Sequence, residues 1–560
     1  MELGQVSHRT LVLLLLGAFA ILCLHGLVWD SPTADEFTHL PVGYFYLKTG
    51  DFDLAARTPP LIKELAALPL LPLSPQIRTA KPARESAWYP WILGTDFMQR
   101  NRPVYDRLFL LGRLPIVALA LLMGVVVHRW SRELYGPAAG LVALTFFAFN
   151  PTLIGHSHVV TADVGVAALG VLALYLFYRW SQEPTAVRML VAGLALGLAQ
   201  LAKTTSVLLY PVLALLVAVA LLRGERPVGR RVGGLAAIVL VSLLVLNAGY
   251  LFQGTGKPLG SFDFQSHFMR GIAGHLPAGL PMPLPAPYLE GFDGVRLDAE
   301  SGEFPNYLFG RWSRQGTPVY YLVCLLFKTP LPLLLACALA PFVRLGTKAR
   351  GEIYLGLPLA VLLVSYSVLT GNVNYGIRHI LSAFPLLFIY ASRLTPFFLE
   401  RGLAIRRTAL AVLAVYPLSA LIATPNTLDY FNVLARGRGD RILLDSNIDW
   451  GQGLKRVRKY MDREGLDHIA LAYFGHVDPA LYGIDFHLPQ PGEPGPIAVS
   501  ANFLHGYGYM TFAGGRMVPV PPDEFRWLEK YPEIEYLGGG MFVVRAGIIP
   551  SPVHSRRALP

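Results

Sequence analysis

The sequence predicts an α-helical protein that crosses a membrane many times, with about eleven transmembrane helices. Three properties of its 560 residues carry this prediction: hydrophobic residues make up 53% of the chain, charged residues only 15%, and the mean hydropathy is +0.44. A typical soluble domain contains roughly 25% charged residues. A soluble protein of this size could not shield so much apolar surface from water, so the chain fits the multi-pass membrane class.

Apolar runs of roughly twenty residues, the length that crosses a bilayer as a helix, define the predicted spans. They lie near residues 10–28, 108–128, 137–155, 162–180, 188–203, 206–222, 232–252, 329–345, 353–370, 379–394 and 408–424. The fifth and sixth runs are separated only by Lys203, Thr204 and Thr205, so they form either a tight hairpin or one broken helix.

The distribution of Lys and Arg predicts that the N-terminus is cytoplasmic. With that orientation the inside loops carry sixteen Lys and Arg residues, and the short outside loops carry two, Lys203 and Arg378. This asymmetry is the one expected from the positive-inside rule. Most of the basic residues flank apolar segments and form no aromatic-interleaved stripe, so the expected partners are membrane lipids and not nucleic acid.

Three segments on the outside are long: residues 29–107, residues 253–317 and the tail. The tail alternates strand-like runs, such as 468–474, with helical ones near 450–464 and 523–530. We therefore predict a membrane domain over residues 1–424, with a large first outer loop, and an extracytoplasmic α/β domain over residues 425–560.

The segment after the first span carries two neighbouring acids, Asp35 and Glu36, followed by His39. Thr33 and Glu36 have the spacing of a capping box, so one interpretation is that Glu36 only closes the start of a helix. Asp35 would then be the second residue of that helix. Free amide donors and the positive helix end would keep it ionised and able to accept a proton.

A second acid, Asp163, follows His156 and His158 at another outside boundary. Asp163 is either a favourable charge at a helix start or a functional group. The two histidines with Asp163 raise the alternative of a divalent metal site, but alternate spacing in a loop without further acids makes this the weaker interpretation.

Basic side chains at the outside boundaries need an explanation, because an ionised group within the bilayer is unfavourable by about 3 kcal/mol. They are Lys63, Lys203, Lys328 and Arg378, the last followed by His379. Each could extend to lipid headgroups. If several converge around an acid, they would instead suit a phosphate or diphosphate attached to a lipid.

At these positions the sequence resembles the GT-C membrane glycosyltransferases of the protein O-mannosyltransferase and aminoarabinose transferase group, known as glycosyltransferase family 39. The matching stretches are Asp35-Glu36 with His39, Gly43-Tyr44, Gly50-Asp51, Pro59-Pro60-Leu61, Thr161-Ala162-Asp163, Leu201-Ala202-Lys203 and the segment from Gly376 to Leu381. Further pieces, from Phe327 to Pro332 and from Asp445 to Gln452, resemble a prokaryotic branch of that group.

The resemblance implies a GT-C fold and transfer of a sugar from a polyprenyl-phosphate donor to a glycan, lipid or protein acceptor. The reaction would occur on the outer face of the plasma (cell inner) membrane with inversion at the anomeric carbon, and no cofactor is implied. Asp35 would be the general base and Glu36 its neighbour in the acceptor site. The residues expected to bind substrate are His39, Arg57, Lys63, Asp163, Lys203, Lys328, Tyr375, Arg378 and His379.

Two other hypotheses remain open at this point. A transporter or flippase for a polyprenyl-linked or anionic solute would place its ionisable groups near the bilayer midplane and often has repeated halves. The candidates here cluster at one interface, and the chain has no evident internal repeat. A non-catalytic assembly scaffold, in which Asp35 and Glu36 only cap a helix, would retain function with Asn at position 35.

Overall fold

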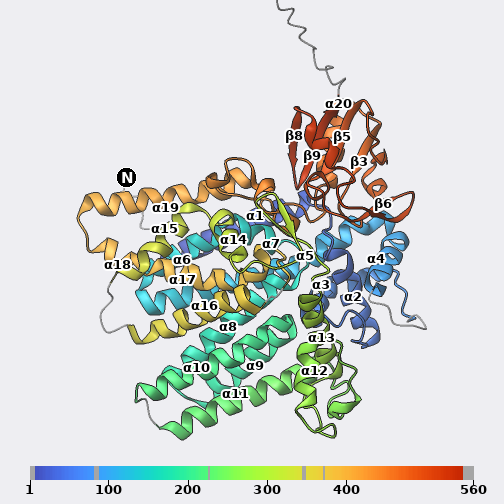
Figure 1. Cartoon of the computed structure of the whole chain (residues 1–560). Helices are drawn as coiled ribbons and strands as arrows, with labels where there is room; N and C mark the ends of the chain where they lie inside the picture. The colour runs from blue at the N-terminus through green and yellow to red at the C-terminus, as the bar shows by residue number, and fades with distance from the viewer. Residues whose placement is uncertain (1–6, 81–87, 225–226, 344–348, 370–371, 547–560) are drawn as a thin grey trace, which may run out of the picture. The chain divides into compact units, whose positions relative to one another are not determined.

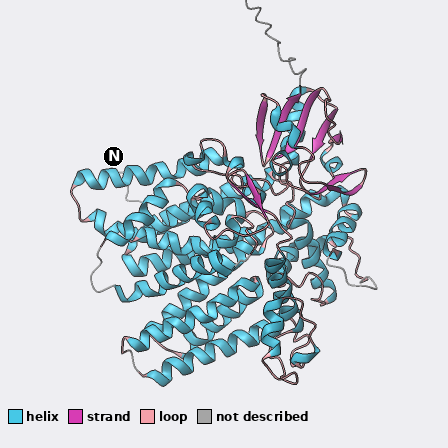
Figure 2. Cartoon of the chain, in the orientation of Figure 1, coloured by secondary structure: helices cyan, strands magenta, loops and turns pink. Residues whose placement is uncertain are grey.

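The computed structural model describes residues 7–80, 88–224, 227–343, 349–369 and 372–546, and these form two compact units. The first unit contains residues 1–28 and 35–447, and the second contains residues 29–34 and 448–560. Nearly all helices belong to the first unit and the main sheet to the second (Figure 1, Figure 2). The domain boundary predicted at residues 424 and 425 stays a prediction.

The first unit begins with one long helix and a group of short ones. They are α1 (His8–Trp29), α2 (Glu36–Thr49), α3 (Leu61–Ala67), η1 (Leu68–Leu73), α4 (Tyr89–Arg100) and η2 (Arg102–Val104). The middle of the unit holds α5 (Tyr105–Tyr135), α6 (Pro137–Ala148), α7 (Pro151–Ser157), α8 (Ala162–Gln182), α9 (Ala186–Ala202), η3 (Thr204–Leu208), α10 (Leu209–Leu222) and α11 (Val228–Gly249).

The predicted outer segment 253–317 folds into η4 (Leu259–Ser261), α12 (His267–Gly274), α13 (Ala286–Ser301) and the hairpin of β1 (Asn306–Leu308) and β2 (Arg311–Ser313). The unit continues with α14 (Tyr320–Lys328), α15 (Leu331–Leu339), η5 (Ala340–Phe342), α16 (Ala349–Leu369), η6 (Ile377–Ala383), α17 (Phe384–Ser392), α18 (Leu394–Leu399) and α19 (Leu403–Ala423). Three short turns, η7 (Val433–Ala435), η8 (Gly439–Arg441) and η9 (Asp445–Asn447), end it.

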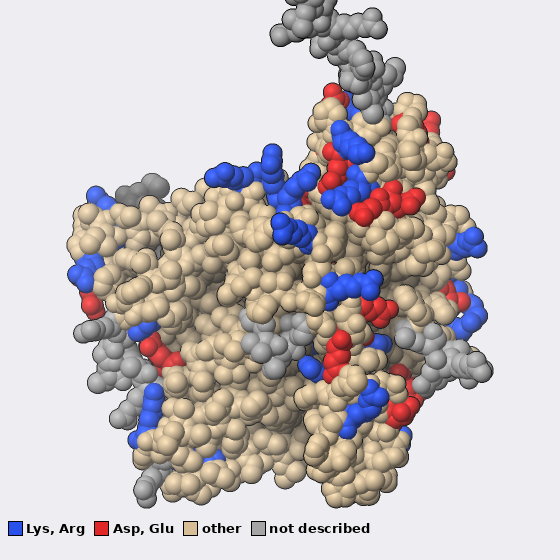
Figure 3. Space-filling view, viewed as in Figure 1, with Lys and Arg blue, Asp and Glu red and all other residues tan. Residues whose placement is uncertain are grey.

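The described helices confirm a multi-pass membrane protein but not the count of eleven spans. Seven helical stretches are long and apolar enough to cross a membrane, and two bent pairs could each add one. The pairs are α6 with α7, bent by 64°, and α14 with α15 and η5, bent by 118°. The two remaining predicted spans lie on α9 and α16, whose apolar stretches are shorter. Figure 3 shows a surface over the helices that is mostly uncharged.

Small residues allow the helices to pack closely. α9 lies against both α8 and α11. At Gly193 and Gly197 of α9, an added Cβ would lie 2.7 Å and 2.5 Å from the Cβ atoms of Val241 and Val245 on α11. Such contacts between small residues let two helices approach inside a membrane, where no hydrophobic effect drives them together.

The second unit is built around a five-stranded mixed sheet in the order β4-β3-β5-β9-β8. Its strands are β3 (His468–Ala472), β4 (Asp485–His487), β5 (Gly495–Ser500), β8 (Ile534–Gly538) and β9 (Met541–Ala546). The unit also contains the hairpin of β6 (Tyr509–Ala513) and β7 (Arg516–Val520), and the helical segments α20 (Leu454–Glu464), η10 (Pro479–Tyr482), α21 (Ala501–Leu504) and η11 (Arg526–Lys530).

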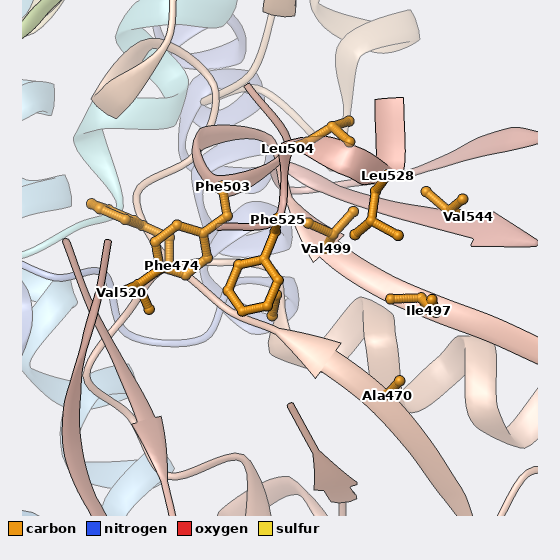
Figure 4. Close-up of a cluster of buried hydrophobic side chains, with 11 residues drawn as sticks. Ala470, Phe474, Ile497, Val499, Phe503, Leu504, Val520, Phe525, Leu528 and Val544 are labelled. Atoms are coloured by element: carbon orange, nitrogen blue, oxygen red, sulfur yellow. The ribbon is translucent and has the colours of Figure 1, made fainter. Parts of the chain in front are cut away.

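The sheet confirms the predicted sheet-containing C-terminal domain. β3 pairs in parallel with β4 and β5, and β9 pairs antiparallel with β5 and β8. Inward-facing residues of β3, β5 and β9 pack against aromatic side chains, including Phe474, Phe503 and Phe525 (Figure 4). This hydrophobic core gives the unit its stability.

Candidate active site

Four charged side chains from distant parts of the first unit form one cluster, which we call the charge cluster: Asp35, Asp163, Lys203 and Arg378. Asp35 directly precedes α2, Asp163 lies in the first turn of α8, Lys203 directly follows α9, and Arg378 is the second residue of η6. Because each side chain lies at the end of its helix, four helix ends meet at this point.

The charges in the cluster alternate. Arg378 Nη1 lies 2.5 Å from Asp35 Oδ2 and 3.9 Å from Asp163 Oδ2, and Lys203 Nζ donates a 2.5 Å hydrogen bond to Asp163 Oδ1. The side chain of Asp163 is 2% exposed, whereas those of Arg378, Lys203 and Asp35 are 13%, 17% and 28% exposed. Asp163 is therefore the most buried of the four side chains, and Asp35 is the most exposed.

Asp35 is held in its ionised form. Burial alone would raise the pKa of its carboxyl, but the positive charge of Arg378, together with His39, outweighs burial and lowers the pKa below its usual value. The expectation that Asp35 is the second residue of a helix is wrong. α2 begins at Glu36, and Asp35 precedes it with backbone angles already in the helical region. Its charge is therefore stabilised mainly by a distant arginine.

Three aromatic or imidazole side chains lie beside the charge cluster. The backbone N–H of His39 donates to Asp35 O, and His39 Nδ1 lies 3.1 Å from Val160 O. Burial lowers the pKa of His39, although Asp35 opposes this shift. Arg378 Nε donates to Tyr375 O, and the Tyr375 and His379 rings lie 5.2 Å apart. The structure thus brings six predicted site residues together around Asp35.

Glu36, the neighbour of Asp35, has a different environment. Arg113 of α5 donates two hydrogen bonds of 2.8 Å to its two carboxylate oxygens, and the Val160 N–H donates a third. The side chains of Glu36 and Arg113 are 0% and 1% exposed. The interpretation of Glu36 as only a helix cap is wrong, because its carboxylate joins α2 to α5 and to the segment before α8.

Two predicted phosphate contacts, Lys63 and Lys328, are satisfied by backbone carbonyls. Lys63 Nζ donates to Ala55 O at 3.1 Å and Thr58 O at 2.7 Å, and burial lowers its pKa to about 7. Lys328 Nζ donates to Leu428 O at 2.9 Å and also to Asn447 O. Both side chains are buried, so each ammonium group holds loops together.

Arg57, another residue expected to bind substrate, binds a carboxylate elsewhere. Its Nε and Nη2 atoms donate to Asp298 of α13 at 2.8 Å and 3.1 Å. Its side chain is 46% exposed. The pair ties the segment before α3 to the predicted outer segment 253–317.

Sequence reasoning missed two residues of this region, Arg113 and Asp445. Arg113 is a charged residue inside the apolar run 108–128, and that position alone could have marked it as a partner for a buried acid. Asp445 lies near Asp35 and Arg378: burial raises its pKa, while the charge of Arg378 lowers it. Its backbone φ of 55° is unusual for a residue other than glycine.

The alternative of a metal site at His156, His158 and Asp163 gains no support from the geometry. His156 and His158 are buried, and His158 Nδ1 lies 2.9 Å from the backbone oxygen of Ile154. Among the described residues, no group of three or more His, Cys, Asp or Glu side chains is arranged to hold a metal ion.

Part of the chain matches a known protein family. Residues 107–249 match the family model described as dolichyl-phosphate-mannose-protein mannosyltransferase. This segment contains Arg113, Asp163 and Lys203. No curated protein matches the chain.

The structural similarities are distant. ArnT from Cupriavidus metallidurans, solved with undecaprenyl phosphate, is 13% identical, with a TM-score of 0.48 over 95% of this chain and 97% of that chain. The oligosaccharyltransferase of Archaeoglobus fulgidus is 14% identical, with a TM-score of 0.48 over 92% and 75%. The protein O-mannosyltransferase Pmt1-Pmt2 complex of S. cerevisiae, bound to the sugar donor, is 19% identical, with a TM-score of 0.33 over 45% and 34%.

The family model covers the part of the chain that supplies half of the charge cluster. The predicted resemblance to the protein O-mannosyltransferase group is therefore confirmed over residues 107–249.

Proposed function

We propose that this protein transfers a sugar from a polyprenyl-phosphate donor to an acceptor, with Asp35 as the general base and inversion at the anomeric carbon. The observation that carries the proposal is the accessible Asp35 carboxylate, which lies 2.5 Å from Arg378 and is held ionised by it. The description of the matching family, a mannosyltransferase that uses a dolichyl-phosphate sugar, supports a lipid-phosphate donor.

The proposed reaction is a single displacement. The acceptor hydroxyl oxygen attacks the anomeric carbon while its proton passes to Asp35, a step that a carboxylate can assist only in its ionised form. The bond between the anomeric carbon and the phosphate oxygen breaks, and the electron pair leaves with the phosphate. Arg378 and Lys203 are the accessible cations that would stabilise this developing negative charge.

The other predicted residues receive different parts in this proposal. Asp163, bound to Lys203 and close to Arg378, would orient both cations. His39, Tyr375 and His379 would form the walls of the sugar site. Glu36 would maintain the backbone next to Asp35 through Arg113, and Lys63, Lys328 and Arg57 would support the surrounding loops.

The proposal includes the extracytoplasmic face of the plasma (cell inner) membrane as the reaction site, with a cytoplasmic N-terminus. The asymmetry of sixteen against two basic residues in the predicted short loops supports this orientation. The acceptor would be a glycan, a lipid or a protein.

The decisive experiment is a donor screen with purified protein in lipid nanodiscs, in which a panel of polyprenyl-phosphate sugars is combined with glycan, lipid and peptide acceptors. We expect one donor to release polyprenyl phosphate, more slowly with Asp35→Asn, and NMR of the product should reveal an inverted anomeric configuration. If no donor is cleaved but proteoliposomes move a polyprenyl-linked sugar across the bilayer unchanged, the protein is a transporter or flippase and the proposal is wrong.

A further inference from the structure

The segment Asp445-Ser446-Asn447 has no part in the chemistry described so far, yet it lies against the residues that carry Arg378. The Asn447 side chain is fully buried. Its Oδ1 atom accepts a 3.0 Å hydrogen bond from the backbone N–H of Ile377, the residue before Arg378. Ser446 Oγ donates a 2.7 Å hydrogen bond to Tyr375 O. Two consecutive side chains therefore hold the backbone on either side of Gly376.

Gly376 itself fits this arrangement closely. Its φ of 90° lies in a region that residues with a side chain rarely adopt. An added Cβ would lie 2.7 Å from Ser446 Oγ and 3.2 Å from the Asn447 side-chain amide. The turn that leads into Arg378 therefore packs directly on these two side chains, and its backbone has little freedom to move away.

Asn447 is anchored on its other side as well. Its Nδ2 atom donates to Tyr320 OH at 2.9 Å and to Leu444 O at 2.9 Å, and its backbone oxygen accepts from Lys328 Nζ. Tyr320 and Lys328 are both buried. Asp445, two residues earlier, has a left-handed φ of 55°, a conformation that persists only where the surroundings enforce it.

We propose that Asn447 is a positioning residue for Arg378. Through its bonds to α14 on one side and to the Ile377 N–H on the other, it holds the turn that directs the Arg378 guanidinium group toward Asp35. The proposal rests on the proposed function, because Arg378 is the group meant to meet the donor phosphate. It assigns Lys328 to the same support, because Lys328 Nζ donates to the backbone oxygen of Asn447 and to that of Leu428.

The physical reason lies in the geometry of arginine. Its planar guanidinium group donates in fixed directions, so a small rotation of the backbone weakens bonds to a carboxylate or phosphate more than it would for lysine. Loss of the hydrogen bond between the Ile377 N–H and Asn447 should therefore reduce the difference in donor turnover between arginine and lysine at position 378.

The first test is hydrogen exchange of the complete protein in detergent, followed by mass spectrometry of a peptide that covers residues 375–381. We expect at least tenfold faster exchange in Asn447→Ala than in the wild type. Asn150→Ala is the matched control, because Asn150 is also fully buried, accepts from a backbone N–H and donates to a tyrosine hydroxyl. It should leave this peptide unchanged. Unchanged exchange in Asn447→Ala would overturn the proposal.

The second test is a double-mutant cycle with Arg378→Lys, measured as donor turnover. If Asn447 acts through Arg378, the two changes are non-additive, and Arg378→Lys has a much smaller effect in the Asn447→Ala background. Additive effects would mean that Asn447 is only structural. Tyr320→Phe, which removes one hydroxyl, serves if Asn447→Ala does not fold, and it should shift exchange and turnover in the same direction.

The two tests separate this inference from the proposed function. If the wild type cleaves no polyprenyl-phosphate sugar, the proposed function fails, and the exchange experiment alone decides whether Asn447 holds the turn. If turnover is observed but exchange in residues 375–381 does not respond to Asn447→Ala, the proposed function stands and this inference fails.

Discussion

Two adjacent carboxylates, Asp35 and Glu36, lie in different environments and illustrate two uses of an ion pair. Glu36 is sealed with Arg113, with two parallel hydrogen bonds and almost no exposure. Asp35 accepts a hydrogen bond from Arg378 Nη1 and remains 28% exposed. A buried pair with satisfied geometry holds elements together, whereas an accessible pair can exchange its partner for a substrate.

The largest expected effect concerns the buried pair of Glu36 and Arg113. Arg113→Met leaves the Glu36 carboxylate buried without its main partner, and we expect a loss of about 3–5 kcal/mol in the free energy of unfolding. Thermal unfolding of the purified protein measures this. The double variant Glu36→Gln with Arg113→Met removes both charges and should recover part of the loss. Wild-type stability in the single variant would contradict the interpretation that the Glu36–Arg113 pair holds these helices together.

The accessible pair of Asp35 and Arg378 should show the opposite pattern, with a large effect on turnover and a small effect on stability. Asp35→Asn preserves size but removes the proton acceptor, so we expect turnover to fall by a factor of about a hundred or more. Thermal stability should stay close to that of the wild type, because Asp163 still lies near Arg378. Near-wild-type turnover in this variant would exclude Asp35 as the base.

The cation of the accessible pair gives a smaller effect. Arg378→Lys keeps the charge but loses the planar fork, and the loss of one charge-assisted hydrogen bond should lower turnover or donor affinity on the order of tenfold. Initial rates across a range of donor concentrations separate an effect on turnover from an effect on donor affinity. Arg378→Ala should be more severe, and wild-type kinetics in both variants would assign Arg378 to lipid headgroup contact.

The accessible pair also sets the pH dependence. Catalysis needs ionised Asp35, so the rate is maintained above its pKa and falls as the pH drops through it. Arg378 lowers this pKa, so the acid limb of the wild type should lie below about pH 4, the ordinary value for aspartate. In Arg378→Gln burial dominates, and the limb should move to higher pH in a single-turnover profile. An unmoved limb would mean that another group titrates.

The proposed reaction requires the Asp35–Arg378 pair to lie on the outer side of the membrane. Single cysteines at Gln99, Ala278 and Ala480, which are exposed positions, should react with an impermeant reagent from outside, and one at Val228 should not. The parent protein has Cys23, Cys324 and Cys337 replaced, so that only the new thiol reacts. Labelling of Val228 alone would reverse the orientation.

The positions of charged residues along the sequence were sufficient to predict several members of the charge cluster as site residues. Asp35, Asp163, Lys203 and Arg378 are each a charge at the end of an apolar run, and a charge in such a position needs a partner or a function. The same argument also selected Lys63 and Lys328, whose partners are carbonyls. Position relative to the membrane identifies an unusual charge but does not distinguish a structural partner from a substrate.

The sequence by itself determined the membrane class, the approximate positions of the long apolar helices and the presence of a C-terminal sheet, because the length and periodicity of apolar runs act locally along the chain. Only the tertiary structure decided that Asp35 meets Arg378, 343 residues away, while Glu36 meets Arg113. Neighbouring residues at the start of a helix point in different directions, and what each one contacts depends on how distant helices pack around that turn.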